Sequence, residues 1–189
     1  MRTREAMLLD ELRTFAPVDA LEASHYVRLV DLLTGEGDAF SRHRWVPGHV
    51  TASAFIVDDA GRLLLLHHRR LGRWLQTGGH VEPAELPLAA ALREGAEESG
   101  LADLQPLGTG ILDIDIHAIP PGKGEPDHHH FDVRFLARTE NPGAISMDPV
   151  ESNDLAWVTL DRAVEMMNEE ASTRAIRKIG TLITGRKHT

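Results

Sequence analysis

Residues 79–101, GHVEPAELPLAAALREGAEESGL, constrain this chain more than any other segment. On a helix, the spacings between Glu94, Glu97 and Glu98 place three carboxylates on one face within a single turn. Each like-charge pair at such a spacing costs about 0.2–0.5 kcal/mol in an exposed helix. The cluster therefore needs a cationic partner, and a divalent ion with oxygen ligands, such as Mg²⁺, suits it.

The same segment resembles the signature of the Nudix hydrolase family, G-x5-E-x7-R-E-U-x-E-E-x-G-U, in which U is a bulky aliphatic residue. The matching positions are Gly79, Glu85, Arg93, Glu94, Glu97, Glu98, Gly100 and Leu101. A glutamate-rich helix alone is usually a solvated face, but glycines and an arginine in register favour an intact metal site. The chain departs from the family pattern in two places, because Gly95 replaces an aliphatic residue and Gln76-Thr77 stands where the family commonly has Leu-Pro.

The resemblance implies a metal-dependent hydrolysis. In the family, the acids of the Arg-Glu-x-x-Glu-Glu segment hold the metals, so it assigns Mg²⁺ or Mn²⁺ and a catalytic role to Glu94, Glu97 and Glu98. It also suggests that Gly78 lends its carbonyl to a metal and that Arg93 pairs with Glu85 to orient the acids. Phosphoanhydride hydrolysis needs charge neutralisation and an activated water, which bound metals supply. The implied substrate is a nucleoside diphosphate linked to another moiety, and the motif does not say which.

Further candidates lie outside the motif. Glu151 is the first candidate for a general base, with Glu140 and Asp154 behind it, and a surface acid is the alternative. Guanidinium groups grip phosphate oxygens bidentately, so a second set of residues just before the glycine loop is predicted to bind substrate, with a solvated turn as the alternative. These residues are Arg69, Arg70 and Arg73.

Three successive histidines, residues 128–130, need separate weighing. On a strand, His128 and His130 point one way and His129 the other. Together with Asp132 they would form a polar patch opposite the Asp113, Asp115 and His117 side of a second strand. Three interpretations remain open: substrate contact, which places His130 and Asp132 in the binding site, a solvated strand face, and a Zn²⁺ site.

Hydrophobic periodicity predicts the secondary structure. Helices are expected over residues 7–15 and 20–33, with Asp19 as N-cap, and a hairpin over 50–57 and 63–68. After the 88–98 helix come two antiparallel strands, in which Leu112, Ile114 and Ile116 face the core. A last strand at 157–158 precedes a helix from Asp161 that breaks around Ser172. The sum is an α+β chain.

The resemblance implies an α/β/α sandwich with a mixed sheet over residues 46–170. We therefore divide the chain into an N-terminal helical extension, residues 1–45, and a Nudix hydrolase domain, residues 46–189. The extension is expected to pack on the core or on a second subunit, which would make a homodimer.

Composition limits the partners. A net charge of −9 argues against a broad nucleic-acid surface, and no apolar run is long enough to cross a membrane. The acidic residues near the N-terminus exclude a signal peptide there, so a cytoplasmic protein is expected. Two alternatives to a hydrolase remain, a non-catalytic nucleotide sensor and an isopentenyl-diphosphate isomerase. The second relies on a cysteine, and this chain has none.

Overall fold

The fold is described from a computed structural model, which covers residues 2–108, 110–122, 124–150 and 152–186. The described strands are β1 (His49–Val57), β2 (Leu63–His68), β3 (Arg73–Leu75), β4 (Thr77–His80), β5 (Gln105–Pro106), β6 (Asp113–Ile119), β7 (His128–Arg138) and β8 (Ser152–Val158). They form one mixed sheet in the order β3-β2-β1-β7-β5, in which β4 pairs with β1, β6 with β7 and β8 with β2. The central pair, β1 and β7, is parallel.

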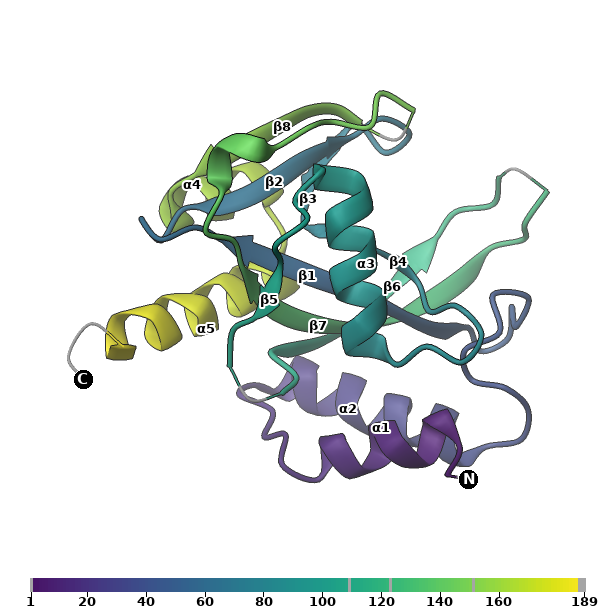
Figure 1. Cartoon of the computed structure of the whole chain (residues 1–189). Coiled ribbons are helices and arrows are strands. Elements are labelled where there is room, and N and C mark those ends of the chain that lie inside the picture. Colours follow the sequence, from purple (N-terminus) through teal and green to yellow (C-terminus); the bar gives the residue numbers. More distant parts are fainter. Residues whose placement is uncertain (1, 109, 123, 151, 187–189) are drawn as a thin grey trace.

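Helices cover both faces of this sheet (Figure 1). The described helices are α1 (Arg4–Leu12), α2 (Ala20–Thr34), α3 (Pro87–Ser99), the short 3₁₀ turn Pro142–Ala144, α4 (Leu160–Met167) and α5 (Glu170–Arg186). The expected mixed sheet with flanking helices is confirmed, and so are the hairpin of β1 and β2 and the antiparallel pairing of β6 and β7.

Local signals set the ends of most helices. Asp19 caps α2 as predicted, since its side chain accepts from the backbone N–H of Glu22 at 2.8 Å. Gly100 ends α3 with φ at 75°, the left-handed conformation that favours glycine. Two boundaries were predicted wrongly. The first helix ends at Leu12, before Phe15, and the C-terminal break falls at Asn168, which adopts a left-handed φ of 48°, and not around Ser172.

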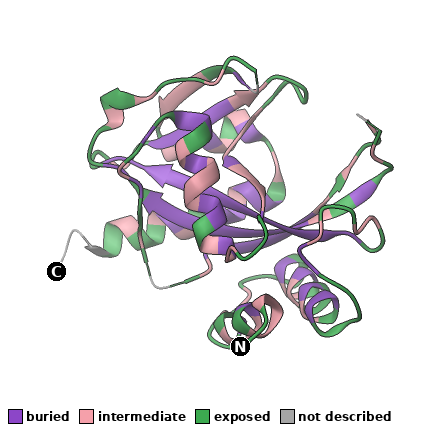
Figure 2. Ribbon diagram, turned by 45° about the vertical axis from the view of Figure 1, so that its right-hand side comes forward, coloured by how far each residue is buried: buried purple, intermediate pink, exposed green. Residues whose placement is uncertain are grey.

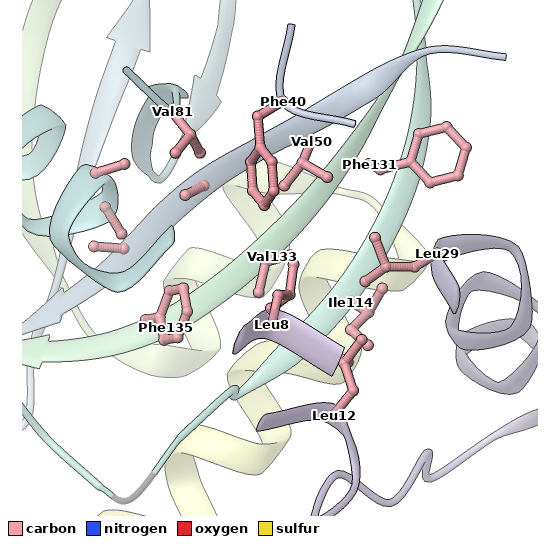
Figure 3. Packing of buried hydrophobic residues seen from close by; sticks show 14 of the residues in the cluster. Leu8, Leu12, Leu29, Phe40, Val50, Val81, Ile114, Phe131, Val133 and Phe135 are labelled. Carbon is pink, nitrogen blue, oxygen red and sulfur yellow. The ribbon is translucent and has the colours of Figure 1, made fainter. Parts of the chain in front are cut away.

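Two hydrophobic clusters fill the two sides of the sheet. One face of β1 and β7 packs against α1, α2 and α3, and Figure 3 shows Leu8, Leu12 and Leu29 meeting Ile114 and the β7 side chains there. The other face packs against α4 and α5. Because both faces are covered, the central strands are buried along most of their length (Figure 2). The N-terminal helices thus pack on the core, and a contact with a second subunit stays a prediction.

One expectation about β6 needs correction. Ile114 and Ile116 join the cluster under α2, but Leu112 precedes the strand and packs in the other cluster, with α4 and α5. Asp113 and Asp115 do point to the opposite face, yet that face is buried too. A period of two cannot distinguish a strand that is covered on one side from a strand that is covered on both.

The outer edge of β6 is covered by side chains instead of another strand. Glu22 and His25 of α2 accept the backbone N–H groups of Ile114 and Ile116, at 3.3 and 3.2 Å. On the same edge, Lys178 donates to the carbonyl of Leu112 at 2.9 Å. An exposed edge strand is prone to pair with other chains, and these contacts remove its open hydrogen-bonding groups.

Gly95 has a clear packing reason. A Cβ at this position would lie 2.9 Å from Leu104 Cδ1 and 3.3 Å from Ile56 Cδ1. The missing side chain therefore lets α3 approach β1 closely, and the departure from the motif leaves the carboxylates of the helix in place.

Candidate metal centre and active site

Helix α3 positions the three acids of the motif. Pro87 lies at the start of the helix, where its missing N–H is not needed, and the following turns contain no breaker except Gly95. The acids differ in exposure, because the side chain of Glu97 is 60% exposed whereas Glu98 is only 6% exposed. The Glu97 carboxylate is therefore accessible to solvent, whereas the Glu98 carboxylate is enclosed by the protein.

Arg93 organises this group of acids. Its guanidinium contacts both carboxylate oxygens of Glu85, at 3.1 and 3.0 Å, and one oxygen each of Glu94, at 2.8 Å, and Glu97, at 3.1 Å. It also donates to the carbonyl of His80 at 2.9 Å. We call Arg93, Glu85, Glu94, Glu97 and Glu98 the Arg93 cluster. The pairing of Arg93 with Glu85 that the sequence predicts is present.

The electrostatics of the pair follow from these bonds. Hydrogen bonds from Arg93 to Glu85 are the main reason that the pKa of Arg93 lies above its usual value. Burial works to raise the pKa of Glu85, but the hydrogen bonds from Arg93 and from the Glu82 N–H outweigh it, so the pKa is lowered. The pair therefore stays charged at neutral pH and fixes the loop to the helix.

Gly78 and Gly79, which the sequence placed in a loop, belong to strand β4 and lie directly against the acids. The backbone N–H of Gly78 donates to Glu98 Oε2 at 2.9 Å. A Cβ on Gly79 would come within 2.5–2.7 Å of the Glu94 carboxylate, and a Cβ on Gly78 would clash with Ser53. Gly78 therefore has no room for a side chain, and a side chain at position 79 would displace the Glu94 carboxylate.

This arrangement fits a bound divalent ion. Arg93 engages one oxygen each of Glu94 and Glu97, and Glu98 accepts from the backbone N–H of Gly78 in β4. A hard ion such as Mg²⁺ or Mn²⁺ takes oxygen ligands of this kind and keeps further positions for water and phosphate. Glu94, Glu97, Glu98 and the Gly78 carbonyl are the groups that would hold it.

The three arginines predicted to bind substrate contact different elements. Arg69 donates to the Asn153 side chain of β8 at 3.1 Å. Arg70 donates to the carbonyl of Pro120 at 3.4 Å, and Arg73 pairs with Glu169 between α4 and α5. The structure does not bring them together as one group.

The candidates for the general base are spread out. Glu151 lies outside the described residues. Glu140 follows β7, where it pairs with Arg138, at the end of β1 and β7 away from the Gly78–Ser53 pairing. Asp154 lies on β8 opposite His67. The structure thus places neither Glu140 nor Asp154 in the Arg93 cluster, and Glu151 stays the sequence-based prediction.

Asp132 and His130 lie on the sheet face opposite α3. Asp132 is 3% exposed and accepts from Ser53 Oγ at 2.8 Å and from Arg134 Nε at 3.0 Å. His130 lies two residues before Asp132 on the same face of β7, among other histidines. The solvated strand face is therefore excluded for His128, which is 5% exposed, while His129 on the opposite face is exposed.

Sequence reasoning missed a buried ionic group behind the sheet. Arg134 donates to Asp132 and, at 2.8 Å, to Asp115, and it lies 3.5 Å from Asp113, which Arg174 of α5 also contacts at 2.8 Å. We call these five residues the Arg134 cluster. The alternation of charged residues in β6 and β7 was visible, but their partner on α5 comes from a distant segment. No local signal pointed to it.

Comparison with known proteins supports the resemblance. A family model described as the NUDIX domain matches residues 47–179. This chain belongs to the Nudix family. The match includes the whole Arg93 cluster and extends into α5.

Individual relatives are more distant. A probable DHNTP pyrophosphohydrolase of Lactococcus lactis is 33% identical over 97 residues, which are 50% of this chain and 57% of the relative. An m7GpppN-mRNA hydrolase of Xenopus laevis is 41% identical over 68 residues, 35% of this chain and 23% of the relative. The chain thus aligns with little more than half of one of these Nudix relatives and about a quarter of the other.

Solved structures share the fold. A Nudix family hydrolase from Clostridium perfringens has a TM-score of 0.55 at 28% identity, and the match covers 75% of this chain and 99% of that one. The family model begins at residue 47, so the N-terminal helices lie outside its match. None of the helices in the described ranges is long and apolar enough to cross a bilayer.

Proposed function

We propose that this chain is a Mg²⁺- or Mn²⁺-dependent pyrophosphohydrolase that cleaves the diphosphate bond of a nucleoside diphosphate linked to another moiety. The observation that carries the proposal is the Arg93 cluster. It connects three carboxylates of helix α3 to the Gly78-Gly79 segment of β4, and Arg93 hydrogen-bonds to two of these carboxylates. The relatives named as pyrophosphohydrolase and mRNA hydrolase support the same class of reaction.

The residues would divide the work as follows. Glu94, Glu97 and Glu98 hold the divalent ions, which when bound neutralise phosphate oxygens and lower the pKa of water. Arg93 keeps the Glu94 and Glu97 carboxylates oriented, and Glu85 fixes Arg93 through two hydrogen bonds. The N–H of Gly78 fixes Glu98. Glu151 is the proposed general base.

A pocket beside the glycine loop offers room for part of a substrate. It has a volume of about 300 Å³ and lies between residues 38–43 and residues 80–83, with Arg4 and Arg42 among its lining residues. Arg42 pairs with Glu125 at 3.3 Å through a side chain that is about half exposed, so this cation can exchange its partner for a phosphate. Arg42 thus joins Arg69, Arg70 and Arg73 as a proposed substrate contact.

The substitution Glu98→Gln tests the reaction. It keeps the shape of the side chain and removes a carboxylate, so we expect kcat to fall at least about 100-fold with the fold retained. Phosphate release would be measured with Mg²⁺ or Mn²⁺ over nucleotide sugars, nucleoside triphosphates, dinucleoside polyphosphates and coenzyme A. Glu165→Gln, on the exposed side of α4, is the matched control and should leave kcat unchanged.

Two results would contradict the proposal. Full activity of Glu98→Gln on the best substrate would exclude the Arg93 cluster as the catalytic centre. Tight nucleotide binding without turnover by the unaltered protein, with Mn²⁺ present, would instead favour a nucleotide sensor.

A further inference from the structure

Histidines gather at one end of the sheet, on the face opposite α3. His49 begins β1, His80 ends β4, and His128 and His130 lie near the start of β7. The ring centroid of His130 is 4.9 Å from that of His49, 5.3 Å from that of His80 and 5.1 Å from that of His128. These side chains come from three strands, so their meeting is a property of the fold.

The strand register explains the gathering. His49 pairs with His130 across the parallel strands β1 and β7, and His80 pairs with Thr51 across β1 and β4. Residues opposite one another, and alternate residues of one strand, share a face. His49, His80 and His130 therefore project to the same side, whereas Gly79 faces Glu94 and α3.

The distances suit a shared ion. One ring nitrogen from each of His49, His80 and His130 lies within 4.8 Å of the other two. Nitrogens bound to tetrahedral zinc at about 2.0–2.1 Å are about 3.4 Å apart. Small side-chain rotations that move the ring nitrogens by about 1 Å would bring them to this spacing. Nε2 of His130 also hydrogen-bonds to Nε2 of His128 at 3.2 Å, so His128 helps to fix the His130 ring.

His49 provides an independent sign of a ligand. Its ring is fully buried, and Nδ1 lies 3.2 Å from the carbonyl of Arg44. A carbonyl only accepts, so Nδ1 carries the proton and Nε2 presents a lone pair. Among the described residues, Nε2 has no hydrogen-bond partner. A buried acceptor left unpaired is unfavourable, and a histidine held by a carbonyl through its other nitrogen is the usual form of a metal ligand.

The protonation states agree with ligation. Burial lowers the pKa of His49 to about 4 and that of His130 to about 2, and it also lowers the pKa of His80. All three rings are therefore neutral near pH 7, which is the form that binds a metal. Three neutral nitrogens suit zinc and other divalent transition metals, whereas Mg²⁺ requires oxygen ligands.

We propose that His49, His80 and His130 bind one divalent transition-metal ion, with zinc as the best-suited ion, at a site distinct from the Arg93 cluster. The two sites lie on opposite faces of β4 and are connected through one residue, because the carbonyl of His80 accepts from Arg93 Nη2. An ion at the histidine site would hold the end of β4 and thereby position Arg93. The binding site itself does not depend on the proposed hydrolysis.

The experiment uses full-length protein without a histidine tag, stripped with EDTA and titrated with Zn²⁺ in excess Mg²⁺. We expect one equivalent of Zn²⁺, and visible absorption bands of tetrahedral Co²⁺ when cobalt replaces zinc. His130→Asn should weaken Zn²⁺ binding by more than about 100-fold. His129→Asn is the matched control on the exposed face of the same strand and should bind like the unaltered protein. Glu98→Gln should also keep the ion.

Each outcome decides the question. Equal Zn²⁺ affinity in His130→Asn and the unaltered protein would overturn the proposal, and so would loss of the ion in Glu98→Gln. Circular dichroism checks the fold of each variant. If His130→Asn does not fold, X-ray absorption at the zinc edge of the unaltered protein decides: nitrogen ligands at about 2.0–2.1 Å support the site, and a shell of oxygen ligands contradicts it.

Discussion

The Arg93 cluster and the Arg134 cluster are built from the same residue types and lie on opposite faces of one sheet. In the Arg93 cluster, one guanidinium contacts three of the four carboxylates, and the Glu97 side chain is 60% exposed. In the Arg134 cluster, two guanidiniums serve three carboxylates, all buried. An excess of acid at an accessible surface favours binding of a further cation, whereas each buried aspartate of the Arg134 cluster already contacts a guanidinium of the protein.

The pKa values follow the same contrast. Burial works to lower the pKa of Arg134, but the charges of Asp115, Asp132 and Asp113 outweigh it and raise the pKa. Burial likewise works to raise the pKa of Asp115, and Arg134 outweighs it, so that pKa lies well below its usual value. These groups stay charged and serve the fold. A cluster of acids with an arginine is therefore a poor marker of a site unless its exposure and charge balance are known.

The largest effect is expected from removing the centre of the buried cluster. Arg134→Met leaves three buried aspartates without their shared partner, so the free energy of unfolding should fall by about 3–5 kcal/mol. Urea unfolding measures it. Arg138→Met is the control, because Arg138 lies at the exposed end of the same strand and pairs with exposed Glu140, a contact worth less than about 1 kcal/mol. Equal losses in both variants would show that burial does not distinguish the clusters.

A smaller effect, on activity, is expected from disturbing the open cluster. In Gly79→Ala the new Cβ would lie within 2.5–2.7 Å of the Glu94 carboxylate and displace it. We expect kcat to fall about 10–100-fold in a phosphate-release assay, since a displacement of about 1 Å can have that effect, with little change in stability. Gly143→Ala is the control, because a Cβ there meets nothing within 4 Å. Unchanged kcat in Gly79→Ala would mean that the position of Glu94 is not critical.

The smallest effect is expected at Gly95, in the helix α3 that carries the Arg93 cluster. Alanine is favoured over glycine within a helix by about 1 kcal/mol, and Gly180→Ala in α5 should gain most of this, since its nearest contact would be 3.5 Å away. Gly95→Ala would place a Cβ 2.9 Å from Leu104 Cδ1, so the gain should be cancelled and the melting temperature should stay near that of the unaltered protein. A stabilisation equal to that of Gly180→Ala would refute the packing explanation.

The parts of the fold that local sequence determines were predictable. The spacing of Glu94, Glu97 and Glu98 depends only on the helical period, and the ends of α3 depend on Pro87 and Gly100. The break at Asn168 was missed although asparagine is the second choice for a left-handed helix end.

What depends on distant segments was not predictable. The parallel pairing of β1 with β7 brings His49 to His130, and no periodicity in either strand contains that register. The contact of Arg174 with Asp113 joins α5 to β6 in the same way. The histidine run at residues 128–130 was recognised, but two of the three proposed ligands, His49 and His80, were not.

The N-terminal helices have a consequence for how the chain is made. Leu8, Leu12 and Leu29 are buried against β6 and β7, which are encoded much later in the sequence. A ribosome adds roughly 5–20 residues per second, so these apolar faces leave the exit tunnel several seconds before their partners exist. During synthesis they form an exposed hydrophobic surface, and folding can finish only after β7 has emerged. Although they precede β7 in the sequence, the N-terminal helices thus reach their final environment only after β7 is made.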